Sequence, residues 1–335
     1  MTFGELFSGA GGMSLGLKQA GFTPKWAFDS DKDACLTYNN MIGDHADCMK
    51  IEHVDFSMQP NINGLAFGFP CNDFSIVGEQ KGTSGYFGGL YQYGVEAINA
   101  LHPEWFIAEN VPGLISSGNG SIMQEFSNAG IGYNMSVHMY KFEEYGVPQL
   151  RRRVIGVGIR SDLQLNFRPP EPTHQNPISS RMALMGVESV IHNNEIPRHT
   201  KRVSEMLSYI PPGENVWYEQ LPEEYRIKGN VKMSLIYRRL HPDFPSYTIV
   251  ASGGGGTHGY HYEECRALTN RERARLQSFP DDFVFSGNTQ SVRKQIGMAV
   301  PPLGAKIIGE ALLKTLTGQS YNSVDSSIGV LNKNE

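Results

Sequence analysis

Two short motifs with reactive side chains stand at the ends of two apolar runs. Pro70-Cys71 follows the run 65–69, and Glu109-Asn110 comes 38 residues after the cysteine. A preceding proline restrains the backbone beside the thiol, and a thiolate is a strong nucleophile. A carboxylic acid at a neighbouring strand end can share its proton with a ring nitrogen. The pair indicates covalent attack on an electron-poor ring, and cytosine is such a ring.

The four cysteines of the chain give no sign of a metal site. Cys35, Cys48, Cys71 and Cys265 lie far apart and form no Cys-x-x-Cys pair. Neither a zinc site nor a disulfide framework is therefore expected. We interpret Cys35 and Cys48 as small buried hydrophobic residues.

The charges of the chain are segregated along the sequence. The net charge is −5, but residues 1–110 carry 13 acids against 5 lysines, and their balance of −8 leaves +3 for the remainder. Arginine first occurs at Arg151, and clusters follow at 151–153, 238–239 and 266–275. Guanidinium groups bind phosphates well, so these clusters predict contacts to a nucleic acid.

A regular alternation of strands and helices is predicted for residues 1–168. Expected strands are 2–7, 25–28, 65–69, 105–108, 135–140 and 154–159, and expected helices are 14–20, 31–40 and 90–101. This rhythm is typical of a doubly wound α/β domain.

A second, smaller and irregular domain is predicted over 169–289, where the sequence becomes rich in proline and glycine. Residues 290–317, with a helix at 303–316, are expected to return to the first domain, and 318–335 to form a disordered tail. No run approaches the length of a membrane span and no leader precedes the first strand, so we expect a cytoplasmic protein without a membrane partner.

The glycine-rich turn 7–12 falls between the first expected strand and the first helix. Glycines let a ligand approach the backbone and leave amides free at a helix N-terminus. Asp29, at the end of the second strand, is placed to bind ribose hydroxyls, which indicates an adenosine-containing cofactor. Nicotinamide and flavin enzymes use a similar turn, but hydride transfer gives no role to Cys71 and Glu109. Methyl transfer to a carbon gives both residues a role.

The whole series of motifs resembles the cytosine carbon-5 DNA methyltransferases of bacterial type II restriction-modification systems, which use S-adenosyl-L-methionine. The resemblance implies the mixed α/β sheet of methyltransferases with a target-recognition domain. The matching segments, in family order, are 7–12, 68–71, 109–111, 145–153 with its Gln-x-Arg-x-Arg signature, 266–280 and 295–302.

The resemblance assigns six catalytic-site residues. Cys71 would be the nucleophile, with Pro70 as its rigid support. Glu109 would contact ring nitrogen 3, and Asn110 would orient the nucleophile loop. Arg153 would contact the base, and Arg151 would brace the pocket. In chain order these residues are Pro70, Cys71, Glu109, Asn110, Arg151 and Arg153.

The cofactor residues that the family implies come from six segments. They are Phe7, Ser8, Gly9, Ala10, Gly11, Gly12, Asp29, Ser30, Asp47, Cys48, Gly68, Pro70, Leu90, Ala299 and Val300. For Cys48, core packing is the preferred interpretation.

The expected partner is double-stranded DNA, read by a segment between 172 and 265. A stacked cytosine hides its faces, so the target base must swing out of the duplex. The implied DNA-binding residues are Asn72, Ser75, Thr248, Ser252, Gly253, Gly254, Gly255 and Gly256. We expect a monomer, with a separate restriction endonuclease as a possible partner and no metal.

Three departures from the family pattern qualify these roles. Asn72 stands where glutamine is usual, Met298 replaces an asparagine, and 85–90 lacks the usual Asp and Arg. Two alternatives remain open: a tRNA cytosine-5 methyltransferase, whose typical Cys-Phe-Thr is absent here, and a catalytically silent DNA-binding relative. A dinucleotide oxidoreductase leaves the Cys71 and Glu109 pair unexplained.

Overall fold

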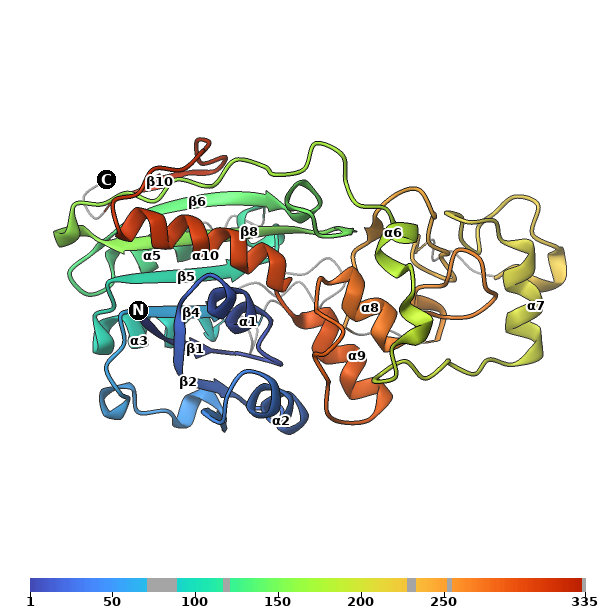
Figure 1. Cartoon of the computed structure of the whole chain (residues 1–335), viewed down its shortest axis with the longest axis horizontal. Coiled ribbons are helices and arrows are strands. Elements are labelled where there is room, and N and C mark those ends of the chain that lie inside the picture. Colours follow the sequence, from blue (N-terminus) through green and yellow to red (C-terminus); the bar gives the residue numbers. More distant parts are fainter. Residues whose placement is uncertain (71–88, 117–120, 228–232, 252–254, 333–335) are drawn as a thin grey trace.

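A computed structural model of the chain describes residues 1–70, 89–116, 121–227, 233–251 and 255–332. Figure 1 shows a larger lobe built on a sheet and a smaller lobe of short helices and loops, with helices α8 (Asn270–Leu276) and α9 (Thr289–Met298) between them.

The sheet of the larger lobe has eight strands among the described residues, in the order β10-β6-β8-β5-β4-β1-β2-β3. The five strands from β3 to β5 are parallel, and β8, β6 and β10 follow in antiparallel pairs. This confirms the predicted mixed, doubly wound α/β fold. The strands are β1 (Thr2–Leu6), β2 (Thr23–Asp29), β3 (Ala46–Cys48), β4 (Gly64–Gly68), β5 (Trp105–Asn110), β6 (Tyr133–Lys141), β8 (Arg152–Arg160) and β10 (Gly329–Leu331).

Helices cover both faces of this sheet. The strand side chains alternate: Leu65 and Phe67 of β4 enter one core cluster, and Ala66 enters the other. The first core includes residues of α3 and α5, and the second includes residues of α1 and α10, which lie in front of the sheet in Figure 1. The helices of this lobe are α1 (Gly12–Gln19), α2 (Lys32–Met41), α3 (Tyr91–Leu101), α4 (Gly113–Ser116), α5 (Ser121–Asn128) and α10 (Pro302–Leu316).

The contact between α1 and α10 depends on two glycines. A Cβ atom at Gly16 would lie 2.3 Å from the Pro302 carbonyl oxygen, and one at Gly309 would lie 2.9 Å from both the Ala20 and Leu17 side chains. Any larger residue would push the two helices apart. The C-terminal helix therefore packs on the first helix of the chain.

The smaller lobe has little regular structure, as its sequence predicts. Its only described strand, β9 (Ser246–Tyr247), pairs in parallel with β7 (Gln149–Leu150), which joins the lobes. The remaining helices are α6 (Ser180–Leu184) and α7 (Lys201–Tyr209). Short 3-10 turns in the chain are Ile51–His53, Phe56–Met58, Phe142–Tyr145, Ser161–Leu163, Val187–Ser189, Glu223–Tyr225 and Gly255–Thr257. The division at 168 and 289 stays an interpretation.

The C-terminal segment corrects one expectation. Residues 318–332, predicted as a disordered tail, run back over the larger lobe. The Val324 amide donates to the Pro169 carbonyl at 2.9 Å, and β10 pairs with the outer edge of β6. A short strand without a strong apolar pattern gains its stability from that edge, which local sequence does not reveal.

One described segment, Thr289–Leu316, is long and apolar enough to resemble a membrane span, contrary to the sequence-based expectation. It consists of the two helices α9 and α10, separated at residues 299–301, and 67% of its most apolar window is buried inside the protein. Its apolar residues pack in two of the hydrophobic cores of the protein.

Candidate active site and cofactor cradle

The carboxyl ends of β4 and β5 bring the two predicted catalytic motifs together. Gly68 and Glu109 are direct partners in the parallel pairing of these strands. Parallel strands end at the same edge of a sheet, where α/β proteins bind their ligands. Cys71, Asn72 and Ser75 lie outside the described residues, and Pro70 is the last described position before them. The motif Phe69-Pro70 therefore leads the chain away from this edge beside Glu109.

Glu109 forms an ion pair with Arg153 at this edge. Arg153 Nε lies 2.8 Å from Glu109 Oε1, and the side chains are 14% and 12% exposed. The second carboxylate oxygen, Oε2, would lie 3.0 Å from a Cβ atom at Gly68, so glycine leaves room for the acid. Arg153 also donates through Nη1 to the Arg152 carbonyl at 2.7 Å. The carboxylate is thus oriented by a guanidinium and still reached from solvent.

Asn110 holds the start of the predicted nucleophile loop. Its buried amide donates through Nδ2 to the Phe69 carbonyl at 3.1 Å, while its Oδ1 accepts from the Val111 amide at 2.8 Å. Both contacts are local to the two strand ends. They fix the chain immediately before Pro70, in keeping with the orienting role that the sequence predicts.

Arg151 is fully buried and joins three segments. It donates through Nη1 to the Ile249 carbonyl at 3.2 Å and through Nη2 to the Gly297 and Ala299 carbonyls, both at 3.0 Å. Its side chain therefore ties the larger lobe to the chain at Ile249 in the smaller lobe and to the motif 295–302. The bracing of a base pocket that the resemblance implies for Arg151 stays a prediction.

Two buried glutamines, absent from the predicted site, complete this brace. Gln149 Nε2 donates to Gln277 Oε1 at 2.7 Å, and Gln149 Oε1 accepts from the Ile249 amide at 2.9 Å. Gln277 then donates to the Ile296 and Ala299 carbonyls at 2.7 and 3.0 Å. Gln149 lies in the family-like segment 145–153 and Gln277 in the segment 266–280, so their place in these segments could have identified them as site residues. Thr248, predicted to bind DNA, donates to the Leu150 carbonyl at 2.7 Å.

The glycine-rich turn 7–12 forms a cradle beside the end of β2. Phe7, Gly9 and Gly11 have φ angles of 55°, 53° and 85°, so the turn is strongly left-handed. The Gly9 amide donates to Asp29 Oδ2 at 2.7 Å, and the Asp31 amide donates to Asp29 Oδ1 at 2.8 Å. The carboxylate that the sequence assigns to a ribose therefore also shapes the turn.

Three observations show that this cradle can accept a ligand. A Cβ atom at Gly9 would meet nothing within 4 Å, so the backbone is open there. The buried Ser8 Oγ has no hydrogen-bond partner among the described residues. Gly12 packs tightly against the closing motif, since its Cβ would lie 2.4 Å from the Val300 carbonyl oxygen. A ligand with a nucleoside part and a further polar group fits this combination of open backbone, hydroxyl and carboxylate.

A buried polar chain lies behind the cradle. Glu5 of β1 accepts a hydrogen bond from Ser14 Oγ, which is 2.8 Å from Tyr38 OH, and this hydroxyl is 3.3 Å from His45 Nε2. Burial raises the pKa of Glu5 to about 8, with Asp29 adding a smaller effect in the same direction. Burial also raises the pKa of Asp29, opposed by the amides of Asp31 and Gly9.

The other predicted cofactor residues lie around the end of β2. Asp47 and Cys48 of β3 pair with Phe28 and Asp29, and Ser30 follows directly. Cys35 is buried as expected, whereas Cys48 is exposed, with its Sγ 3.9 Å from the Ser30 carbonyl. The core-packing interpretation of Cys48 was wrong, because the thiol lies at the open end of an edge strand. The remaining positions are Ala10 (buried) and Leu90 (at the start of α3, 9% exposed).

The predicted recognition loop is described only in part. Ser252, Gly253 and Gly254 lie outside the described residues, and Gly255 begins a 3-10 turn. A Cβ atom at Gly256 would lie 3.1 Å from Ile236, so this glycine packs against the lobe.

Most arginines of the predicted phosphate-binding clusters proved to be structural. Arg239 donates to four carbonyls, those of Leu207, Ile210, His261 and Tyr262, at 2.7 to 3.1 Å. Arg271 donates to those of His192, Pro280 and Phe283. Burial lowers the pKa of both groups. These buried cations donate to backbone carbonyls at the ends of short helices and in the irregular segments of the smaller lobe.

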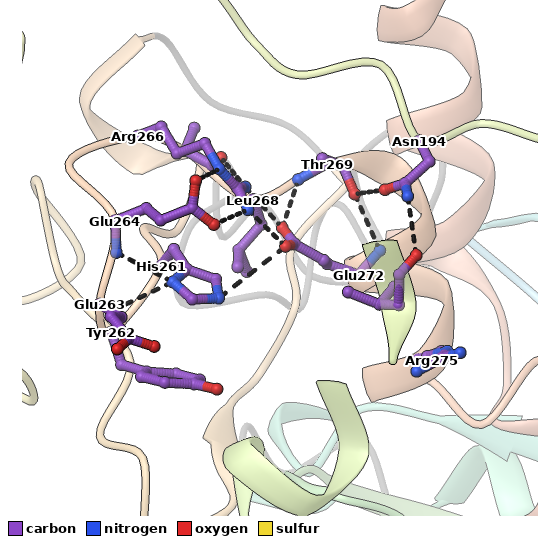
Figure 2. A network of polar contacts seen from close by, with 12 residues as sticks. Asn194, His261, Tyr262, Glu263, Glu264, Arg266, Leu268, Thr269, Glu272 and Arg275 are labelled. Carbon is purple, nitrogen blue, oxygen red and sulfur yellow. Dashed lines mark hydrogen bonds and ion pairs between the residues drawn. The ribbon is translucent and has the colours of Figure 1, made fainter. Parts of the chain in front are cut away.

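The network in Figure 2 shows the same use of charge. Arg266 pairs with Glu264 at 2.7 Å and Glu272 at 2.8 Å, and Glu272 forms a capping box with Thr269 at the start of α8. His261 Nδ1 accepts the amides of Glu263 and Glu264 at 3.1 Å. His261 is therefore a packing residue, and its pKa is lowered by burial. Within the described part of the chain, no group of three metal-ligating side chains occurs.

These features define an α/β protein with a nucleoside-type cradle and an acid–arginine pair at adjacent strand ends. The family model described as C-5 cytosine-specific DNA methylase matches residues 1–314. The chain belongs to this family.

Individual relatives agree with this assignment over most of their length. The chain is 51% identical to the type II methyltransferase M.BbvI of Brevibacillus brevis, with 96% of this chain and 93% of the relative aligned. It is 41% identical to M.NgoFVII of Neisseria gonorrhoeae, over 96% and 88%. A structure described as a DNA modification methyltransferase encoded within an E. coli prophage aligns over 95% and 99%, with a TM-score of 0.75 and 24% identity, and supports the fold.

Proposed function

We propose that this protein methylates carbon 5 of a cytosine that is flipped out of a short duplex DNA sequence, with Cys71 as the nucleophile. The observation that carries the proposal is the Glu109–Arg153 ion pair of 2.8 Å, which stands beside the strand end leading to Pro70 and Cys71. Membership of the C-5 cytosine-specific methylase family supports the same chemistry.

The reaction begins with the Cys71 thiolate, whose sulfur forms a bond to carbon 6 of the ring. In this step Glu109 acts in its carboxylic acid form and shares its proton with ring nitrogen 3, so the electron pair pushed out of the ring double bond is stabilised. Carbon 5 then becomes nucleophilic and accepts the methyl group. Loss of the carbon-5 proton to a base and departure of the thiolate restore the ring double bond. Arg153 keeps the Glu109 carboxyl oriented throughout, and Asn110 fixes the base of the nucleophile loop.

S-adenosyl-L-methionine is the methyl donor in this proposal, and its sulfonium supplies an electrophilic methyl group. The cradle residues would hold it: Asp29 at the ribose, Phe7 beside the adenine, and the Ser8 hydroxyl and open backbone at Gly9 near the methionine part. The backbone at Ala299 and Val300, which packs against Gly12, would close the cradle.

The substrate in this proposal is double-stranded DNA, and the biological role is protection of host DNA beside a separately acting restriction endonuclease. Relatives named as type II methyltransferases support this role. We propose a cytoplasmic monomer, since flipping one base needs a single active site.

The test compares Cys71→Ala with the control Cys265→Ala, which removes a half-buried thiol of the smaller lobe. Transfer of labelled methyl groups to DNA and binding of S-adenosyl-L-methionine are measured for both full-length variants. The expected result is that Cys71→Ala abolishes transfer and retains cofactor binding, while the control keeps both. Normal methylation by Cys71→Ala would overturn the covalent mechanism.

A further inference from the structure

A groove of about 600 Å³ lies in the smaller lobe, apart from the catalytic and cofactor residues. Its walls come from the start of α7 and the segment before it, from α8, from the first half of α9, and from the chain around Tyr237 and His258. None of the arginines of the Glu109 site or the interlobe brace lines it. Nothing in the catalytic chemistry accounts for this cavity.

The lining of the groove is strongly cationic. Arg198, Arg273 and Arg293 line it, and none of its described lining residues is acidic. Arg198 is exposed, whereas Arg273 is 4% exposed and donates to the His258 carbonyl at 2.6 Å. His199 is neutral here in our interpretation, because its Nε2 accepts the Ala267 amide at 2.9 Å. The three guanidinium groups therefore set the charge of the groove.

The cations of the groove also repel one another. The pKa of Arg273 is lowered to about 10, first by burial and next by Arg293, while Glu272 acts in the opposite direction. The N-terminus of α9 adds its positive end, with Thr289 and Gln290 in the wall. Like charges gathered around a cavity are stabilised when an anion enters it. Phosphate matches the fork of a guanidinium, whereas the Gln290 and Ser291 amides at the α9 N-terminus already donate to the Asn288 side chain.

The position of the groove identifies the source of that phosphate. His258, in its wall, directly follows the Gly255–Thr257 turn at the end of the glycine-rich recognition segment. A duplex read by that segment would carry its sugar–phosphate backbone past the same residues. Tyr237 contributes an aromatic wall suited to the sugar.

We propose that this groove binds a backbone phosphate of the DNA substrate, with Arg198 and Arg293 as the contact residues. The inference rests on the proposed function for the identity of the nucleic acid. Arg273 acts as a positioning residue, since its guanidinium holds the His258 carbonyl. Arg198 and Arg293 lie outside the arginine clusters singled out in the sequence, so the groove is a site that those clusters do not predict.

The test measures DNA affinity against salt concentration for full-length Arg198→Gln and Arg293→Gln, using duplex DNA that the wild type methylates. Each lost phosphate contact lowers the slope of log affinity against log salt by about 0.9. We expect a decrease of that size for one or both single variants and for the double variant, with affinity about 10-fold weaker at low salt. The control Arg168→Gln removes an exposed cation of the larger lobe that pairs with Asp325, and its slope should equal that of the wild type.

Two further readouts keep this proposal separate from the proposed function. Cofactor binding and thermal unfolding of the groove variants should match the wild type. Unchanged slopes in both single variants and in the double variant would overturn the groove assignment while leaving the methyltransferase assignment intact. Arginine-dependent binding of inorganic phosphate with an unchanged DNA slope would also overturn it, because a free anion would then be the ligand. Absence of methylation in the wild type would instead contradict the proposed function.

Discussion

Replacing Glu5 with glutamine should make the protein less sensitive to alkaline pH. Glu5 is 2% exposed, accepts a hydrogen bond from Ser14, and faces the negative charge of Asp29. Its pKa rises on folding from an ordinary 4.5 to about 8, chiefly through burial. Between these values the folded state holds a proton that the unfolded state has lost. Stability from this group is therefore present at low pH and is lost as pH rises toward 8.

The size of this effect follows from proton linkage. One pKa unit corresponds to about 1.4 kcal/mol, and the stability penalty of Glu5 grows with pH as long as only the unfolded state is ionised. Between pH 6 and pH 8 the free energy of unfolding should fall by roughly 2 kcal/mol through this carboxyl alone. Glutamine keeps the shape and can accept the Ser14 hydrogen bond without titrating.

The assay is urea unfolding of the wild type and Glu5→Gln at pH 6, 7 and 8. The difference in unfolding free energy between the two proteins should shift in favour of the variant by roughly 2 kcal/mol across this range. The exposed Glu195→Gln serves as a control for loss of one negative charge. A pH-independent difference between wild type and Glu5→Gln would refute the reasoning, because Glu5 would then ionise alike in both states.

Three further substitutions test the geometry of the site. Gly68→Ala places a Cβ atom 3.0 Å from Glu109 Oε2, so methyl transfer should fall about 10-fold with cofactor affinity unchanged; equal losses in both would point to general disruption instead. Asn110→Ala removes the bond to the Phe69 carbonyl and should lower kcat up to about 100-fold with little change in Tm, whereas a normal kcat would exclude the orienting role. Arg151→Met leaves three buried carbonyls without their donor, so calorimetry should show a loss of about 3 kcal/mol in stability; an unchanged Tm would mean that the brace contributes nothing.

The sequence predicts the part of the fold that carries the chemistry because that part follows simple patterns. Central parallel strands such as β4 and β5 are buried on both faces and read as short apolar runs, and the turn at 7–12 carries its glycines between a strand and a helix. Their order along the chain then places Gly68 beside Glu109. Edge strands gave a weaker signal: β3 and β10 have three residues each and form because a neighbouring strand edge is available.

The irregular lobe could not be predicted in the same way, because its stability depends on long-range contacts. In the sequence, Arg239 and Arg271 stand in arginine clusters that suggest a cationic surface. In the structure, each donates to carbonyls of segments many residues away. The exposure of Cys48 was likewise missed, since only the pairing of β3 with β2 puts the thiol at an open sheet edge. Residue type alone does not separate a phosphate-binding arginine from one that caps buried carbonyls.

The most direct test of the central claim is to express the full chain in a host that lacks cytosine methylation and to map 5-methylcytosine in the genomic DNA at single-base resolution. The account predicts methylation within one short sequence motif, which disappears when Cys71→Ala replaces the wild type. Folded protein that binds S-adenosyl-L-methionine but leaves the DNA unmethylated would contradict the account and would make tRNA the next substrate to examine.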